Sequence, residues 1–144
     1  MNSYRFTLPG FLVAGLLLTA SCSKNSDIPE FARCVGGQDG QISLELIARH
    51  HSKLIPSQQN YPDTAYIKFN TSEFPGDDAS LYDLVVAGTY PDTVINISNM
   101  SCGNYYIFMT GFDVAIAERV KGGVPVTLNE EDQHRSLNIP VTED

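Results

Sequence analysis

Apolar and polar residues alternate with a period of two along much of the chain from residue 41 onward. The stretch 41–49 is the clearest case, because its even positions are apolar and its odd positions, apart from Ile47, are polar or charged. This period places alternate side chains on opposite faces of a strand, one buried and one in water. Similar alternation, or a run of β-branched and aromatic residues, predicts further strands. They cover residues 64–70, 82–87, 93–98, 104–110, 114–120, 124–128 and 135–141.

The segments between the predicted strands are short and rich in Gly, Pro, Asn and Asp, which favour turns. The pair Gly122-Gly123, for example, is predicted to turn the strand 114–120 into the next one. A helix over residues 112–121 is the alternative there, since several residues in it are good helix formers. Seven or eight short strands predict an all-β domain at residues 41–144, built as a single antiparallel β-sandwich.

The first 21 residues follow a different pattern. Arg5 lies near the start, an apolar run covers 11–18, and small residues follow it. This order predicts a secretory signal peptide at residues 1–21. A membrane-spanning anchor is the alternative, but it needs about 20 apolar residues, and a proline and two glycines shorten and interrupt this run.

The end of this segment, Thr19-Ala20-Ser21-Cys22, resembles the bacterial lipobox, in which small residues precede a cysteine that receives a diacylglycerol before cleavage. The usual lipobox has Leu three residues before the cysteine, whereas Leu18 stands four before Cys22 here. The resemblance implies a lipoprotein of a Gram-negative cell envelope, attached through Cys22 and expected in the outer membrane. An ordinary signal peptide cut nearby, with Cys22 left as a free thiol, is the alternative.

The three cysteines fit the lipoprotein interpretation. An odd number in an exported protein leaves one thiol without an intramolecular partner. If Cys22 carries a lipid, Cys34 and Cys102 remain, and they are predicted to form a disulfide in an oxidising compartment. Cys34 lies in a polar segment, 22–40, that contains one proline and three glycines and is predicted to be the lipidated N-terminus and linker. A free thiol at Cys34 is therefore the alternative.

A second resemblance lies in the segment Ile95–Asp113. An apolar residue, a glycine, a tyrosine pair and a further glycine follow one another there as Met100, Gly103, Tyr105-Tyr106 and Gly111. This order resembles prealbumin-like (transthyretin-like) or collagen-adhesin B-type domains. Such domains usually act as stalks, spacers or binding modules of surface proteins. The resemblance implies a binding or accessory module of a surface or periplasmic assembly, with a structural stalk as the alternative.

The charge balance restricts the partners. The chain has 17 acidic and 9 basic side chains and a net charge of −8. Nucleic acids and anionic lipid surfaces attract clustered Lys and Arg, so neither is expected to bind through charge. Acyl chains would hold the protein to a membrane without help from charge.

Two short motifs are candidate modification sites. Asp63-Thr64-Ala65 and Asp92-Thr93-Val94 resemble the Asp-Ser/Thr-aliphatic motif that some Gram-negative bacteria use for O-glycosylation of exported proteins. Thr64 and Thr93 are therefore candidate glycosylation sites. The alternative is that Asp-Thr at the start of a strand serves only as turn chemistry.

No pattern for catalysis or metal binding is found in the sequence. His50 and His51 are adjacent, and adjacent residues on a strand point to opposite faces, so they are predicted to form a solvated strand end. His134 stands alone among acidic residues. Nucleophile elbows, phosphate-binding glycine loops and His-Glu-x-x-His are absent from the sequence. We therefore expect a non-enzymatic protein without metal or cofactor, with a hydrolase as the less favoured alternative.

The segment 71–83 is the predicted partner-binding loop, because it is long for a connection between strands. Phe74 and Tyr82 provide aromatic anchors for a protein or glycan partner. The acidic residues proposed to surround them are Asp77, Asp78 and Asp83. Two alternatives remain for this loop: the two rings pack beneath it, or the carboxylates bind calcium, although they do not match the usual calcium loop.

Overall fold

The computed structural model describes residues 34–143, and most of them form β-strands. In this part of the chain the strands are β1 (Ile42–His50), β2 (Lys53–Leu54), β3 (Thr64–Phe69), β4 (Leu84–Ala87), β5 (Ile95–Met100), β6 (Gly103–Asp113), β7 (Glu118–Leu128) and β8 (His134–Glu143). A 3₁₀ turn at Ala79–Leu81 is the only helical element among the described residues. The predicted all-β class is therefore confirmed.

The strands form a mixed sheet in the order β2-β1-β8-β7-β6-β3-β4, and β5 also pairs with β1. β1 and β8 run parallel, with Ser43 opposite His134 and His50 opposite Val141. The expectation of a purely antiparallel arrangement is wrong at this pair. The two strands are about 90 residues apart in sequence, and nothing in the local pattern of either one specifies the direction of its partner.

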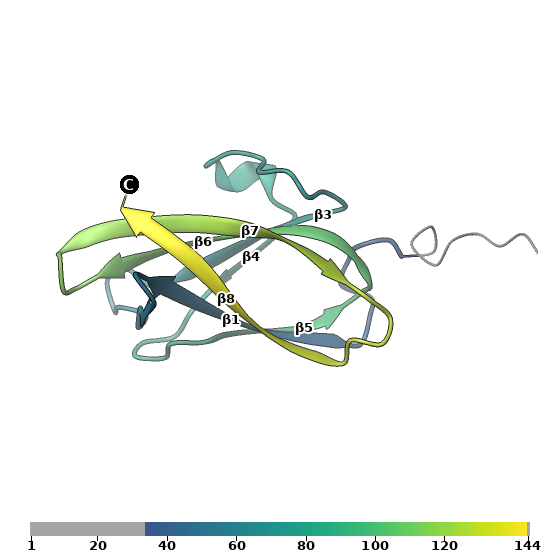
Figure 1. The fold of residues 1–144 in the computed structure, drawn as a ribbon, viewed down its shortest axis with the longest axis horizontal. Coiled ribbons are helices and arrows are strands. Elements are labelled where there is room, and N and C mark those ends of the chain that lie inside the picture. The colour runs from purple at the N-terminus through teal and green to yellow at the C-terminus, as the bar shows by residue number, and fades with distance from the viewer. Residues whose placement is uncertain (1–33, 144) are drawn as a thin grey trace, which may run out of the picture.

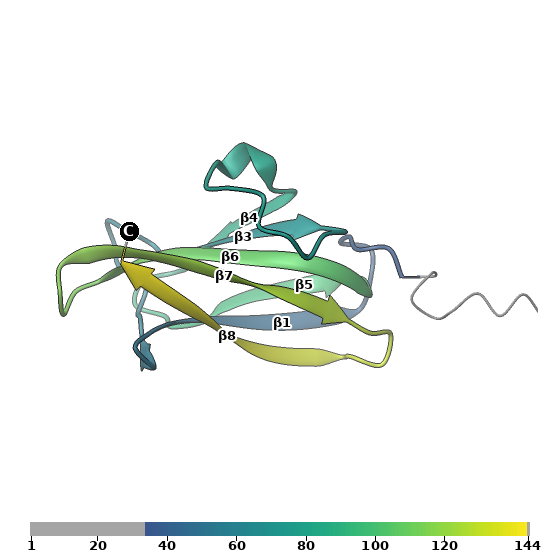
Figure 2. The same cartoon turned by 45° about the horizontal axis from the view of Figure 1, so that its top comes forward.

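β8 connects the two halves of the sheet. It pairs with β1 along most of its length and meets β7 only near its end, where Val120 lies opposite Glu143. Figure 1 shows β8 crossing diagonally from the side of β1 and β5 to the side of β6 and β7. The sheet thereby curls into a half-barrel, which the turned view in Figure 2 also shows.

The concave side of this half-barrel holds one apolar core. The even positions of β1, from Ile42 to His50, are buried, and its odd positions, including Ile47, are half-buried, so burial follows the period of two. Strands from both halves contribute to the core. Its most buried members include Leu44, Leu46, Ile67, Met100, Tyr105, Ile107, Met109, Leu128 and Ile139.

The hairpin between β6 and β7 differs from the prediction. Residues 114–117 form a turn in place of a strand, and Ala117 has a φ of 59°. Gly122 and Gly123 do not turn the chain, because they lie inside β7 opposite Met109 and Phe108. An added Cβ at Gly122 would collide with the Pro140 carbonyl, so this glycine permits the close approach of β8.

Candidate functional site

The predicted signal peptide at residues 1–21 and the predicted lipidation site at Cys22 lie outside the described residues. Cys34 is the first described residue, and its sulfur is bonded to that of Cys102. The Cα atoms of the two cysteines are 5.0 Å apart. The segment that enters the domain is thus joined covalently to the residue just before β6.

Hydrogen bonds also attach residues 34–40 to the domain, although the sequence predicts a linker there. The Gly36 amide donates to Asn70 Oδ1 at 2.7 Å, and the Gly37 amide donates to the Tyr105 hydroxyl at 3.0 Å. Tyr105 in turn donates to the Ser101 carbonyl at 2.7 Å. Burial raises the pKa of this hydroxyl. The point at which the chain enters the fold is therefore fixed.

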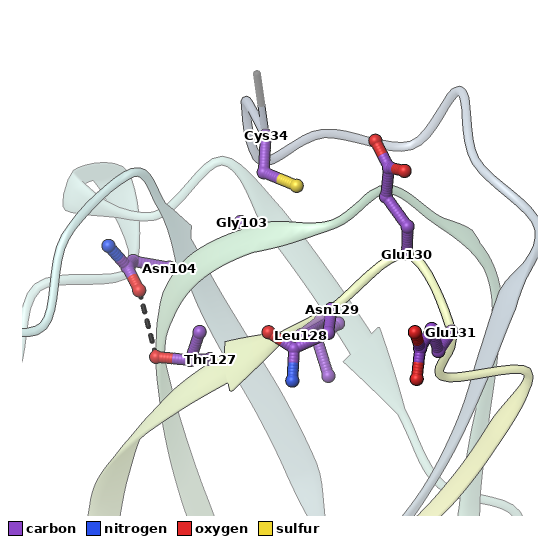
Figure 3. Close-up of a pocket in the computed structure, with 8 residues that line it drawn as sticks. All are labelled: Cys34, Gly103, Asn104, Thr127, Leu128, Asn129, Glu130 and Glu131. Carbon is purple, nitrogen blue, oxygen red and sulfur yellow. Dashed lines mark hydrogen bonds between the residues drawn. The ribbon is translucent and has the colours of Figure 1, made fainter. Parts of the chain in front are cut away.

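A pocket of about 330 Å³ lies beside this entry point. Figure 3 shows Cys34 above it, with Glu130 and Glu131 on the turn between β7 and β8. Asn104 accepts a hydrogen bond from Thr127 Oγ1 at 2.8 Å along one side. Because the Cys34 sulfur belongs to the disulfide, the pocket offers no thiolate nucleophile from this residue.

The loop 71–83 lies over the outer face of the sheet (Figures 1 and 2), where Phe74 and Tyr82 lie near Phe108 of β6. Tyr82 is only 8% exposed, and its hydroxyl donates to the Gly76 carbonyl at 2.9 Å. Burial raises the pKa of Tyr82 to about 12. Phe74 is 48% exposed, while its ring lies 5.4 Å from the ring of Phe108. The prediction of an exposed anchor is therefore wrong for Tyr82, and Phe74 alone of the pair offers ring surface to a partner.

The three aspartates of this loop contact different partners, and their carboxylates do not converge. Asp78 caps the 3₁₀ turn by accepting from the Ser80 amide at 2.9 Å, which lowers the pKa of Asp78. Asp83 accepts from Lys68 Nζ at 2.9 Å and from the Phe69 amide at 2.7 Å. Asp77 pairs with Lys121 Nζ at 2.9 Å. This geometry does not provide the convergent oxygen ligands that calcium requires.

The two candidate glycosylation sites are separate in the fold. Thr64 begins β3 and is half-buried, and its hydroxyl donates to the Pro62 carbonyl at 3.1 Å. Thr93 is also half-buried and precedes β5. Modification of either residue stays a prediction.

A buried carboxyl group, Asp63, was missed by the sequence analysis as a functional candidate. It is 3% exposed, and its backbone is held by the Ser57 hydroxyl and the Gly88 amide. Its Oδ1 atom lies against Gly111 and has no hydrogen-bond partner among the described residues. Burial raises the pKa of Asp63 to about 7. In the sequence, the only notable feature of Asp63 is its position directly before the strand 64–69, and this position does not show that the side chain is buried.

The prediction of a solvated strand end is wrong for His50, which is buried at the end of β1, whereas His51 is exposed. β1 ends at His50, which pairs with Lys53 of β2. His51 and Ser52 form the two-residue turn between them, with φ values of 45° and 69°. The alternation of faces therefore stops at His50, and the two imidazole rings come within 4.2 Å of each other, centre to centre.

Two carboxylates complete this histidine cluster, which consists of His50, His51, Asp113 and Glu143. His50 is 3% exposed, and its Nδ1 lies 2.8 Å from Asp113 Oδ2. Its Nε2 lies 3.3 Å from Glu143 Oε1, and His51 Nε2 lies 3.8 Å from the same oxygen. The hydrogen bond to Asp113 raises the pKa of His50 and lowers that of Asp113. The ends of β1, β6 and β8 bring these residues together (Figure 1).

Comparisons with known proteins give no family for this chain. No protein-family model, curated protein or solved structure matches it. Within residues 34–143, no helix has the length and apolar character needed to cross a membrane.

Proposed function

We propose that this protein is a lipid-anchored lipoprotein of the Gram-negative cell envelope, whose β-domain is a non-catalytic binding or accessory module. The observation that carries the proposal is the bond between Cys34 and Cys102. Disulfides persist in oxidising compartments, which agrees with export. The bond also leaves Cys22 as the remaining cysteine, immediately after the lipobox-like residues.

The chain length suggests how the domain is presented. Cys22 precedes the fixed Cys34 by 12 residues, which span at most about 40 Å at roughly 3.3 Å per residue. On this proposal the entry side of the domain stays close to the lipid surface. The outer membrane is the expected location.

The prealbumin-like sandwich is part of the proposal. Its support is that strands from both halves of the curled sheet enclose one core. Tyr105 and Tyr106 point to opposite faces, with Tyr105 buried and Tyr106 near Phe74 on the loop side. A domain of this kind is proposed to bind through a loop, because strands supply a rigid frame.

The proposed partner surface is the loop 71–83, with a basic protein or a glycan as partner. Phe74 supports it as a half-exposed aromatic ring, and Asp77 supports it as a carboxylate that is 58% exposed. Asp78 and Asp83 are bound to the fold and contribute less to recognition. A stalk without a specific partner is the second candidate.

The anchor is tested by metabolic labelling in a Gram-negative host with a palmitate analogue. The wild-type chain should carry the label, and Cys22→Ser should lose it, because the acceptor thiol is gone. Cys34→Ser serves as the matched control and should keep the label. Equal labelling of wild type and Cys22→Ser would contradict the lipoprotein proposal.

The partner surface is tested by cross-linking in cells followed by mass spectrometry. The double variant Phe74→Ala, Asp77→Asn should capture the partner at least tenfold less well than wild type. A control that removes one exposed apolar side chain and one carboxylate elsewhere is Val114→Ala, Glu130→Gln. Equal capture by the two double variants would contradict this surface, and the absence of any specific partner would favour the stalk.

A further inference from the structure

We propose that the histidine cluster is a binding site for a divalent transition-metal ion, with Zn²⁺ as the expected metal. The proposed ligands are His50 Nε2, an imidazole nitrogen of His51 and a carboxylate oxygen of Glu143. This site is independent of the lipid anchor and of the loop 71–83. Two imidazoles and one carboxylate form a donor set typical of zinc.

The distances fit a tetrahedral ion. Bonds of about 2.0–2.2 Å place neighbouring ligand atoms about 3.3 Å apart. His50 Nε2 lies 3.3 Å from Glu143 Oε1, and His51 Nε2 lies 3.8 Å from it. All three ligand atoms lie within 4.8 Å of one another. His51 is 75% exposed and Glu143 is 51% exposed, so both side chains are able to make the remaining adjustment by rotation.

His50 is oriented as a metal ligand. Its Nδ1 is hydrogen-bonded to Asp113, and a carboxylate in this position fixes the tautomer and ring orientation of zinc-binding histidines. Asp113 is held in turn, because its other carboxylate oxygen accepts from the Ala115 amide at 2.8 Å. When neutral His50 donates its Nδ1 proton to Asp113, its lone pair is on Nε2, the atom that lies 3.3 Å from Glu143 Oε1.

The hydrogen bonding of His50 Nε2 is independent support for a bound ion. It is buried and has no hydrogen-bond partner among the described residues, although Glu143 lies at ion-pair distance. Buried polar atoms are normally satisfied, and such an exception calls for an explanation. A bound cation that Glu143 also contacts would satisfy the atom.

Another cluster with similar spacing does not fit a metal. Cys34, Cys102 and Glu130 also lie within reach of a single ion. Their two sulfurs are bonded to each other, so they supply no thiolate ligands. In the histidine cluster every proposed donor atom is available, and three protein ligands leave the fourth tetrahedral position to water.

The test is a calorimetric titration of the mature chain, purified in detergent without a polyhistidine tag, with Zn²⁺ at neutral pH. One ion should bind per chain. His51→Gln and Glu143→Gln should each weaken binding at least tenfold, because each removes one of three ligands. Both positions are exposed, and circular dichroism should show that both variants remain folded.

A matched control is available at the other end of β8. His134 is exposed and lies 3.6 Å from Glu45, and within residues 34–143 this surface pair belongs to no group of three potential metal ligands. His134→Gln should leave the affinity for Zn²⁺ unchanged. Cobalt substitution should add the intense visible absorption of a tetrahedral ion in the wild type and in His134→Gln. The proposal is overturned if wild type binds no Zn²⁺, or if His51→Gln and Glu143→Gln bind it as tightly as wild type.

Discussion

Replacement of Asp63 by Asn should stabilise the fold, by an amount that depends on pH. Asp63 is 3% exposed, and its Oδ1 has no hydrogen-bond partner among the described residues. Asn has nearly the same shape as protonated Asp and carries no charge at any pH. The variant therefore removes the cost of burying a charged carboxylate and keeps the packing against Gly111.

The magnitude follows from the pKa of Asp63. Burial raises it from its ordinary value of 3.8 to about 7, and each pKa unit corresponds to about 1.4 kcal/mol. The folded state binds the proton more tightly than the unfolded state, so stability falls as the pH rises from about 4 to about 7. Above pH 7 the charged carboxylate lowers the free energy of unfolding by the full amount of about 4 kcal/mol.

The assay is urea unfolding of wild type and Asp63→Asn at pH 4 and pH 8. The variant should be more stable by about 4 kcal/mol at pH 8 and nearly equal to wild type at pH 4. Other titrating groups affect both proteins, so the difference between them isolates Asp63. Asp39→Asn, at an exposed position, is the control and should show a small difference at both values. A stability difference for Asp63→Asn that is the same at pH 4 and pH 8 would refute the reasoning.

Three further predictions concern stability and are measured by urea unfolding. Tyr105→Phe should cost about 1–3 kcal/mol, because the Gly37 amide and the Ser101 carbonyl lose their partner; an unchanged stability would contradict this. Cys102→Ser should lower the free energy of unfolding by about 4 kcal/mol, because the disulfide joins residues 68 positions apart. Reductant should then lower the stability of the wild type alone. Gly122→Ala should cost about 1–3 kcal/mol through its collision with β8, whereas Gly37→Ala, with open space around it, should change little.

The strands of this fold are predictable where burial alternates along one segment. β1, β3 and β8 lie where the period-two pattern predicts them, because one face of each meets the core. The same pattern failed at residues 114–117, where exposed Val114 and Ile116 mimic a strand although they lie in a turn. The pairing of β1 with β8 depends on residues about 90 positions apart, so local pattern does not reveal it.

The histidine cluster shows why the candidate metal site was missed. The rule that neighbours point to opposite faces holds inside a strand, but β1 ends at His50. The left-handed conformation of His51 and Ser52 reverses the chain there. Asp113 and Glu143 come from distant strands, so only the folded chain brings them to the histidines. His51 and Ser52 separate the strand 42–50 from Lys53 and Leu54, and this two-residue spacing was only a weak indication of a hairpin turn.

The loop 71–83 was predicted in place but not in detail. Its length and composition indicated an exposed connection, and Phe74 is half-exposed. Tyr82 is buried because its ring packs near Tyr66 and Phe108 on the outer face of the sheet. Composition does not show which of two aromatic residues in a loop turns toward the sheet.

The most direct test of the proposed lipoprotein is the intact mass of the chain extracted with detergent from membranes of a Gram-negative host. We predict a chain that begins at Cys22, carries the mass of an N-terminal lipid and is lighter by two hydrogens because of the Cys34–Cys102 bond. Reduction should restore those two hydrogens and leave the lipid in place. A chain without lipid, or one whose first residue is not Cys22, would contradict the proposal.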